Sequence, residues 1–218
     1  MKVEHAVLTN GAQVVTTTMP GVESVALGIW VGVGGRHEPA ALSGISHFLE
    51  HLLFKGTRRR TAREISQAIE GRGGELNACT QEESTGYYAR VAAEHLWTAL
   101  DVLVDMHRNA RLAPGDIRKE RDVIIEEILM YRDQPQHQVD EWLGELLWRD
   151  HALGRALTGR PETLRRLERP ALVEFKRRTY VGRNLVFVFA GRVTHAECVA
   201  RVARYLRGLP AGRRPCAV

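Results

Sequence analysis

The most constraining feature of this sequence is the segment H-F-L-E-H at residues 47–51, where two histidines and a glutamate interrupt an apolar helical pattern. Apolar residues recur at helical spacing from Gly44 to Lys55 and flank the motif on both sides. They predict a helix that is buried around most of its circumference. Polar side chains inside such a helix are costly unless satisfied, so the fold has to bring a partner to them.

The spacing of these three residues is typical of a two-imidazole metal site. His47 and His51 lie one helical turn apart, so both imidazoles project from one face toward a common point. Glu50 precedes the second histidine and can reach a metal-bound water without ligating the metal, as a general base does. The alternative is a surface coincidence among the nine histidines of the chain, but the apolar flanks favour a metal site.

A zinc hydrolase uses three protein ligands and leaves the fourth position to water, so a further ligand has to come from elsewhere. Residues 114–116 are predicted to form a loop and helix cap, and the helix that follows from Asp116 runs to about Arg132. This helix offers Glu120, Glu126 and Glu127 among apolar residues. Glu120 and Glu127 share a face, whereas Glu126 points about 100° away from Glu127. We predict Glu127 as the third ligand of one zinc ion per chain. Glu120 completes the catalytic set by orienting a histidine N–H or the zinc cage, and an acidic solvated helix face is the alternative.

Strand signals occupy the start and the middle of the chain. From Val3 to Val33 the pattern is β, and Asn10-Gly11, a dipeptide typical of type I′ turns, separates two Val/Thr-rich runs. A further strand follows from Ser24 to Gly32. The segment Glu75 to Ala92 predicts two strands joined by a polar tract, and the apolar run from Asn184 to Ala190 predicts a buried central strand.

Helical patterns fill the remaining segments, at residues 61–70, 94–109, 137–149, 160–180 and 194–206. No repeat, low-complexity tract or Ser/Gly linker divides the chain, so residues 1–218 are predicted to form one domain, with about 210–218 as a linker or truncated end.

Composition argues against several other classes of protein. The charge of +5 comes from scattered arginines with only short clusters such as residues 58–60, so we expect no nucleic-acid binding. Three distant cysteines, an odd number, indicate neither a disulfide framework nor a CxxC metal site. The start lacks a signal-peptide pattern and the longest apolar run, Val25 to Val33, is too short to span a bilayer. We therefore expect a cytoplasmic protein of bacterial type that binds no membrane.

These residues resemble the pitrilysin-like zinc metallopeptidases, a family that includes insulin-degrading enzyme and the mitochondrial processing peptidase, with its β-type subunits. The order H-x-x-E-H is the inverted zincin pattern. Glu127 and Glu120 match the family's downstream ligand and the functional glutamate that precedes it. The resemblance covers most of the chain, through L-T-N-G-A-Q-V-V, G-G-E-L-N-A, Y-Y-A-R-V and E-E-I-L-M-Y-R-D-Q-P.

The resemblance implies an N-terminal catalytic domain of the α+β class, a single two-layer domain with a mixed, mostly antiparallel sheet covered by helices. It also implies a zinc-dependent endopeptidase that acts on extended or unstructured peptides. The strand formed by Glu75, Leu76, Asn77 and Ala78 is similar to the family's edge that pairs with a peptide substrate, a mode that grips any peptide backbone. Asn77 would add a side-chain hydrogen bond, and the alternative is that Asn77 merely helps to form a turn.

Members of this family continue into a second domain of similar fold that closes over the substrate. The resemblance therefore implies a partner, either a second copy of this chain or a separate subunit. A different function is also open, that of a non-catalytic binding or assembly subunit that has kept the fold. Relatives of that kind typically lack ligand residues, whereas the three ligands and the base are all present here.

Overall fold

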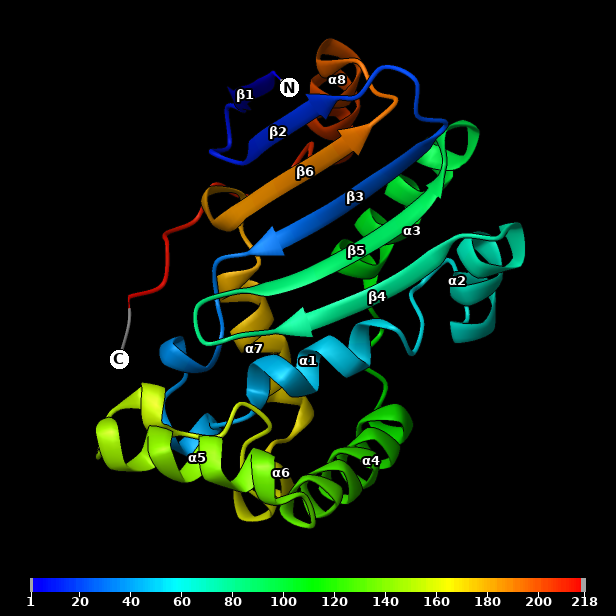
Figure 1. The fold of residues 1–218 in the computed structure, drawn as a ribbon. Helices are drawn as coiled ribbons and strands as arrows, with labels where there is room; N and C mark the ends of the chain where they lie inside the picture. The colour runs from blue at the N-terminus through cyan, green and yellow to red at the C-terminus, as the bar shows by residue number, and fades with distance from the viewer. Residues whose placement is uncertain (1, 217–218) are drawn as a thin grey trace.

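A six-stranded sheet forms the centre of the computed structural model, which describes residues 2–216. Its strands are β1 (Val3–Val7), β2 (Gln13–Thr18), β3 (Ser24–Val31), β4 (Glu75–Thr80), β5 (Thr85–Ala92) and β6 (Leu185–Gly191). They lie in the order β1-β2-β6-β3-β5-β4 (Figure 1). Neighbouring strands run antiparallel except β2 and β6, which are parallel. The predicted mixed, mostly antiparallel sheet is confirmed.

The helices are α1 (Ile45–Leu53), α2 (Ala62–Ile69), α3 (Leu96–Asn109), α4 (Pro114–Arg132), α5 (Pro135–Leu147), α6 (Pro161–Arg166), α7 (Arg169–Thr179) and α8 (His195–Tyr205). Helix α3 packs against β3 and β5, and α8 packs against β2. Helix α1 runs below β4, and α4 packs against α1 (Figure 1). The α+β class predicted from the sequence is confirmed, and the sheet edge formed by β4 lies beside the helix that carries the histidine motif.

The hairpin between β1 and β2 forms as predicted, but its turn is of another type. A type I′ turn needs positive φ at both central residues, and of Asn10 and Gly11 only Gly11 has it, at 83°. The N–H of Gly11 donates to the carbonyl of Leu8, and the N–H of Leu8 donates to the carbonyl of Ala12, both at 2.8 Å. This is a type I turn followed by a left-handed glycine, so the assignment of a type I′ turn was wrong.

Strand β6 confirms the predicted central strand, since it lies between β2 and β3. Its burial alternates, however. Leu185, Phe187 and Phe189 are buried under the helices, whereas Val186 and Val188 face the other side of the sheet and stay partly exposed. An almost wholly apolar strand therefore does not require cover on both faces.

The end of the described chain returns to the sheet. The carbonyls of Pro210 and Ala211 accept hydrogen bonds from the N–H groups of Gly182 and Arg183, just before β6. Residues 217 and 218 of the predicted tail lie outside the described residues, and the assignment of that tail as a linker stays a prediction. No helix within residues 2–216 has both the length and the apolar character that crossing a membrane requires.

Candidate metal centre

Two helices bring the predicted ligand residues together. His47 and His51 lie on α1 and Glu127 lies on α4. The Nε2 atom of His51 is 3.6 Å from Oε2 of Glu127, and Nε2 of His47 is 3.8 Å from the same oxygen. One ligand atom from each residue lies within 4.8 Å of the other two. The carboxylate and both imidazoles therefore converge on one point, across residues far apart in the sequence.

The spacing of these atoms fits zinc. Tetrahedral zinc with bonds of about 2.0–2.1 Å to nitrogen and oxygen places neighbouring ligand atoms roughly 3.4 Å apart. The observed separations of 3.6 and 3.8 Å need only a small movement to reach that value. Burial, followed by the nearby His51, lowers the pKa of His47 to about 4, so the imidazole is neutral near pH 7. A neutral imidazole offers the lone pair that a metal ion requires.

Glu120 lies on the Nδ1 side of the His51 ring, away from the point on which the three predicted ligands converge. Its Oε2 atom is 3.3 Å from Nδ1 of His51, and its Oε1 atom is 2.9 Å from Nζ of Lys55. A proton on Nδ1 donated to Glu120 leaves the Nε2 lone pair free toward Glu127. The geometry therefore suits the orienting role. Sequence reasoning missed Lys55, although it follows His51 by one helical turn and so shares its face.

Glu50 lies on the same helix, turned toward the end of β4. Burial raises the pKa of Glu50, while a hydrogen bond from the hydroxyl of Thr80 and the charge on His51 act in the opposite direction. A general base works best when its pKa lies closer to the working pH than that of a free glutamate. The sequence pattern gave no sign of Thr80, because this contact joins a strand to a helix.

Tyr131 is a further residue of the site that the sequence interpretation omitted. It lies one helical turn after Glu127 on α4, and its ring packs against His137 with the centroids 4.8 Å apart. Burial raises the pKa of Tyr131, and the charge of Glu127 adds to the increase. The spacing of four residues between Glu127 and Tyr131 was the available signal.

The predicted substrate strand forms the edge of the sheet, since β4 pairs with β5 and stands last in the strand order. Leu76 and Ala78 pack against the core, while Glu75 and Asn77 are exposed. Glu75 pairs with Arg90 of β5 at 2.9 Å. The Oδ1 atom of Asn77 accepts the N–H of Ala78 at 2.8 Å, within the strand and not in a turn. A peptide-binding role for these four residues stays a prediction.

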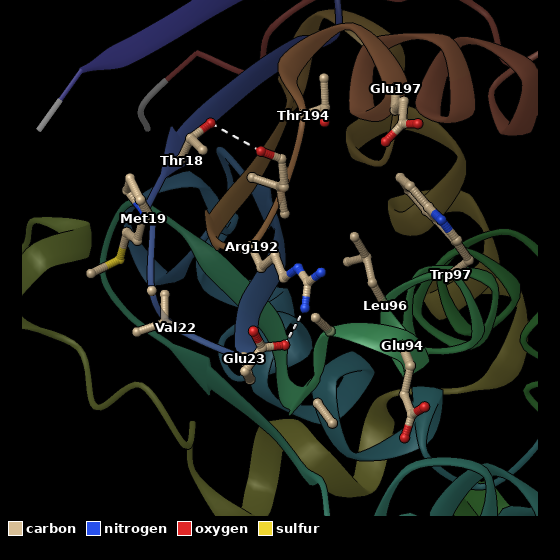
Figure 2. A pocket seen from close by; sticks show the side chains of 15 residues that line it. Thr18, Met19, Val22, Glu23, Glu94, Leu96, Trp97, Arg192, Thr194 and Glu197 are labelled. Carbon is tan, nitrogen blue, oxygen red and sulfur yellow. Dashed lines mark hydrogen bonds and ion pairs between the residues drawn. The ribbon is translucent and has the colours of Figure 1, made fainter.

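A cavity of about 890 Å³ lies elsewhere. Figure 2 shows its lining, where Glu23 pairs with Arg192 and the hydroxyl of Thr18 donates to the carbonyl of Val193. Glu94 and Glu197 lie on other walls. None of its lining residues belongs to the converging set on α1 and α4. The candidate chemistry therefore sits outside this cavity.

A pair of imidazoles on one helix, a carboxylate from a second and a glutamate beside them define a candidate metallohydrolase centre of the H-x-x-E-H type. The chain belongs to the family described as Insulinase (Peptidase family M16), which matches residues 13–160. The resemblance to the pitrilysin-like peptidases is thereby confirmed.

Relatives of known sequence and structure agree with this assignment. The chain is 44% identical over 206 residues to a protein of Mycobacterium leprae named an uncharacterized zinc protease, covering 92% of this chain and 46% of that protein. A protease from Helicobacter pylori has the same fold, with a TM-score of 0.92 and 23% identity over 99% of this chain and 54% of that one. A structure named as a peptidase M16 inactive domain from Pseudomonas fluorescens has a TM-score of 0.91 and 15% identity. The match covers 100% of this chain and 53% of that one. The chain thus spans about half the length of the curated relatives it matches.

Proposed function

We propose that this chain is the zinc-binding catalytic domain of an endopeptidase that hydrolyses extended or unstructured peptides. The observation that carries the proposal is the convergence of His47, His51 and Glu127 on one point, with Glu50 beside it. Membership of a peptidase family with relatives named zinc proteases supports zinc as the metal. We propose one ion per chain, because the described residues bring one such set of three ligands together.

Zinc bound by these three residues would supply a Lewis acid that polarises a carbonyl and lowers the pKa of water. Glu50 accepts a proton from the attacking water and passes it to the nitrogen of the leaving amine. One water is consumed, and because both of its protons end on the leaving nitrogen, the products are a carboxylate and a protonated amine. Glu120 and Lys55 hold the ring of His51 in place. The free edge of β4, at Glu75 to Ala78, would pair with the main chain of the peptide.

The test compares variants by zinc content and by turnover of an unstructured peptide. Glu50→Gln keeps the size of the side chain but not its basicity, so we expect full zinc content and a loss of turnover of at least about a hundredfold. His47→Ala, His51→Ala and Glu127→Ala each remove a ligand, so we expect loss of zinc as well. Undiminished turnover by Glu50→Gln would refute the general-base role.

A second function has its own support. One of the similar structures is named an inactive M16 domain, and its TM-score to this chain is 0.91. An assembly subunit would share the fold without the chemistry. The complete set of three ligands and a base favours the enzyme, since an assembly subunit has no need of them. Wild-type protein that binds no zinc and cleaves no peptide would support the assembly function instead.

We also propose a second domain of similar fold as the partner, either a copy of this chain or a separate subunit. The relatives are about twice as long as this chain, which supports a two-domain arrangement. Helix α5 supports it too, because it has no buried residue and exposes a row of large apolar side chains, namely Val139, Trp142, Leu143, Leu146 and Leu147.

A further inference from the structure

We propose that Thr80 is a positioning residue for Glu50, an inference that rests on the proposed function. Thr80 is the last residue of β4, and its hydroxyl donates a hydrogen bond to Oε2 of Glu50 on α1. Within residues 2–216 this is the one side-chain hydrogen bond that the Glu50 carboxylate accepts. The orientation of Glu50 therefore depends on a residue of the edge strand.

A general base has to hold one oxygen within hydrogen-bond reach of the water that it deprotonates. A glutamate has several rotatable bonds, and a partly buried carboxylate also loses hydration. The Thr80 hydroxyl compensates for part of that loss and fixes Oε2 of Glu50, which leaves Oε1 to face the water. A base that is displaced by even 1 Å can lose about a hundredfold in rate.

The connection between β3 and α1 sets the end of β4 against the motif helix. The N–H of Gly35 donates to the carbonyl of Gln81 at 3.2 Å, and the N–H of Arg36 donates to that of Glu82 at 2.8 Å. Both acceptors lie in the turn that directly follows Thr80. A side chain at Gly34 would place its Cβ 1.9 Å from the carbonyl oxygen of Gln81, so only glycine permits this approach.

The same connection also fixes the start of α1. The carboxylate of Glu38 accepts the N–H of Gly44 at 2.7 Å and the N–H of Ser46 at 2.8 Å. Glu38 is buried, so these bonds are shielded from water. One short segment thus holds both the β4–β5 turn and the first turn of α1. The hydrogen bond between Thr80 and Glu50 therefore joins two elements that this segment holds in place, and is not a chance contact of two surface side chains.

This arrangement joins two steps of the proposed reaction. The edge of β4 is where a peptide would pair, and the end of β4 is where the base is oriented. The strand that aligns the scissile bond therefore also aligns the group that activates water.

The first experiment compares Thr80→Val, which removes the hydroxyl but keeps the β-branched shape, with Thr80→Ser, which restores it. We expect Thr80→Val to lower kcat roughly tenfold or more with unchanged KM and zinc content, and Thr80→Ser to recover most of the rate. Thr85→Val is the matched control, because Thr85 pairs with Thr80 across the strands and its hydroxyl donates to the carbonyl of Val33. We expect it to lower Tm without lowering kcat. A wild-type kcat in Thr80→Val would overturn the inference.

A second measurement does not depend on activity. The free energy of unfolding of zinc-free protein is measured for Thr80→Val, Glu50→Leu and the double variant. A direct contact makes the two changes non-additive, whereas additive changes contradict the contact. If the zinc-loaded wild type cleaves no peptide, the proposed function fails, and this cycle still decides whether Thr80 holds Glu50.

Discussion

His107 is a residue that the fold buries without a hydrogen bond to either ring nitrogen, within the part of the chain that the structure describes. It packs against Tyr180 with the ring centroids 5.4 Å apart. Burial holds the pKa of His107 well below its usual range, and the charges of Lys176 and Arg108 lower it further. In the unfolded chain the imidazole of His107 takes up a proton as the pH falls below about 6.5, while in the folded chain it stays neutral.

The sign of the pH effect follows from that difference. Because the folded pKa is depressed, stability that is present above about pH 6.5 is lost as the pH falls below it, at about 1.4 kcal/mol per pH unit. We predict that His107→Phe removes this slope. The test is the free energy of urea unfolding of the zinc-free wild type and variant, measured from pH 7.5 to 5. His47 also has a lowered pKa, but it is present in both proteins, so its contribution cancels in the difference between their curves. Parallel stability curves would show that His107 takes up no proton on unfolding.

The sequence predicted the residues of the site where the relation was local to one helix. The spacing from His47 to His51 placed two imidazoles on one face, and the spacing from Glu120 to Glu127 did the same for two carboxylates. Neither spacing alone could show that the histidine face of one helix contacts the glutamate face of the other. That expectation came from the family resemblance. Thr80 was beyond prediction, because its contact with Glu50 depends on how a strand end lies against a helix.

At the scale of elements, the N-terminus of α1 offers a prediction about how the motif helix is held. In the wild type both carboxylate oxygens of Glu38 accept backbone N–H groups, those of Gly44 and Ser46. Glu38→Gln keeps one of these acceptor oxygens but replaces the other with an amide N–H₂, which cannot accept a hydrogen bond. We expect a loss of about 1–3 kcal/mol in the free energy of unfolding. Because His47 lies in the first turn of α1, zinc affinity should fall as well. Chemical unfolding and competition with a zinc chelator measure the two effects.

Glu64 supplies the matched control. It belongs to the capping box of α2, where its carboxylate accepts the N–H of Thr61 at 2.7 Å on the exposed surface. We expect Glu64→Gln to destabilise the protein less than Glu38→Gln and to leave zinc affinity unchanged, since α2 carries no ligand. Equal zinc affinity in both variants would show that the cap of α1 does not position His47.

Periodicity and turn residues predicted the elements themselves closely. Helix α4 was expected to follow a loop and cap at Pro114 to Asp116 and to end at about Arg132. It ends at Arg132 as expected but already begins at Pro114, because proline suits the first position of a helix. The turn at Asn10-Gly11 was assigned wrongly, because the same dipeptide also suits a type I turn followed by a left-handed glycine. The order of the strands required knowledge of long-range pairing, which periodicity does not contain.

At the scale of the whole molecule, the metal site joins two helices that the chain connects only through α2, β4, β5 and α3. Zinc that binds the folded site and not the unfolded chain stabilises the fold, by about 4 kcal/mol when free zinc is a thousandfold above Kd. For a chain of this length each kcal/mol raises Tm by about 2–4 °C. We therefore predict that removing zinc with a chelator lowers Tm by roughly ten degrees.

Glu127→Ala serves as the control in scanning calorimetry, because it breaks the link between α1 and α4 and should make Tm insensitive to zinc. A zinc-dependent Tm that persists in Glu127→Ala would place the ion outside this pair of helices.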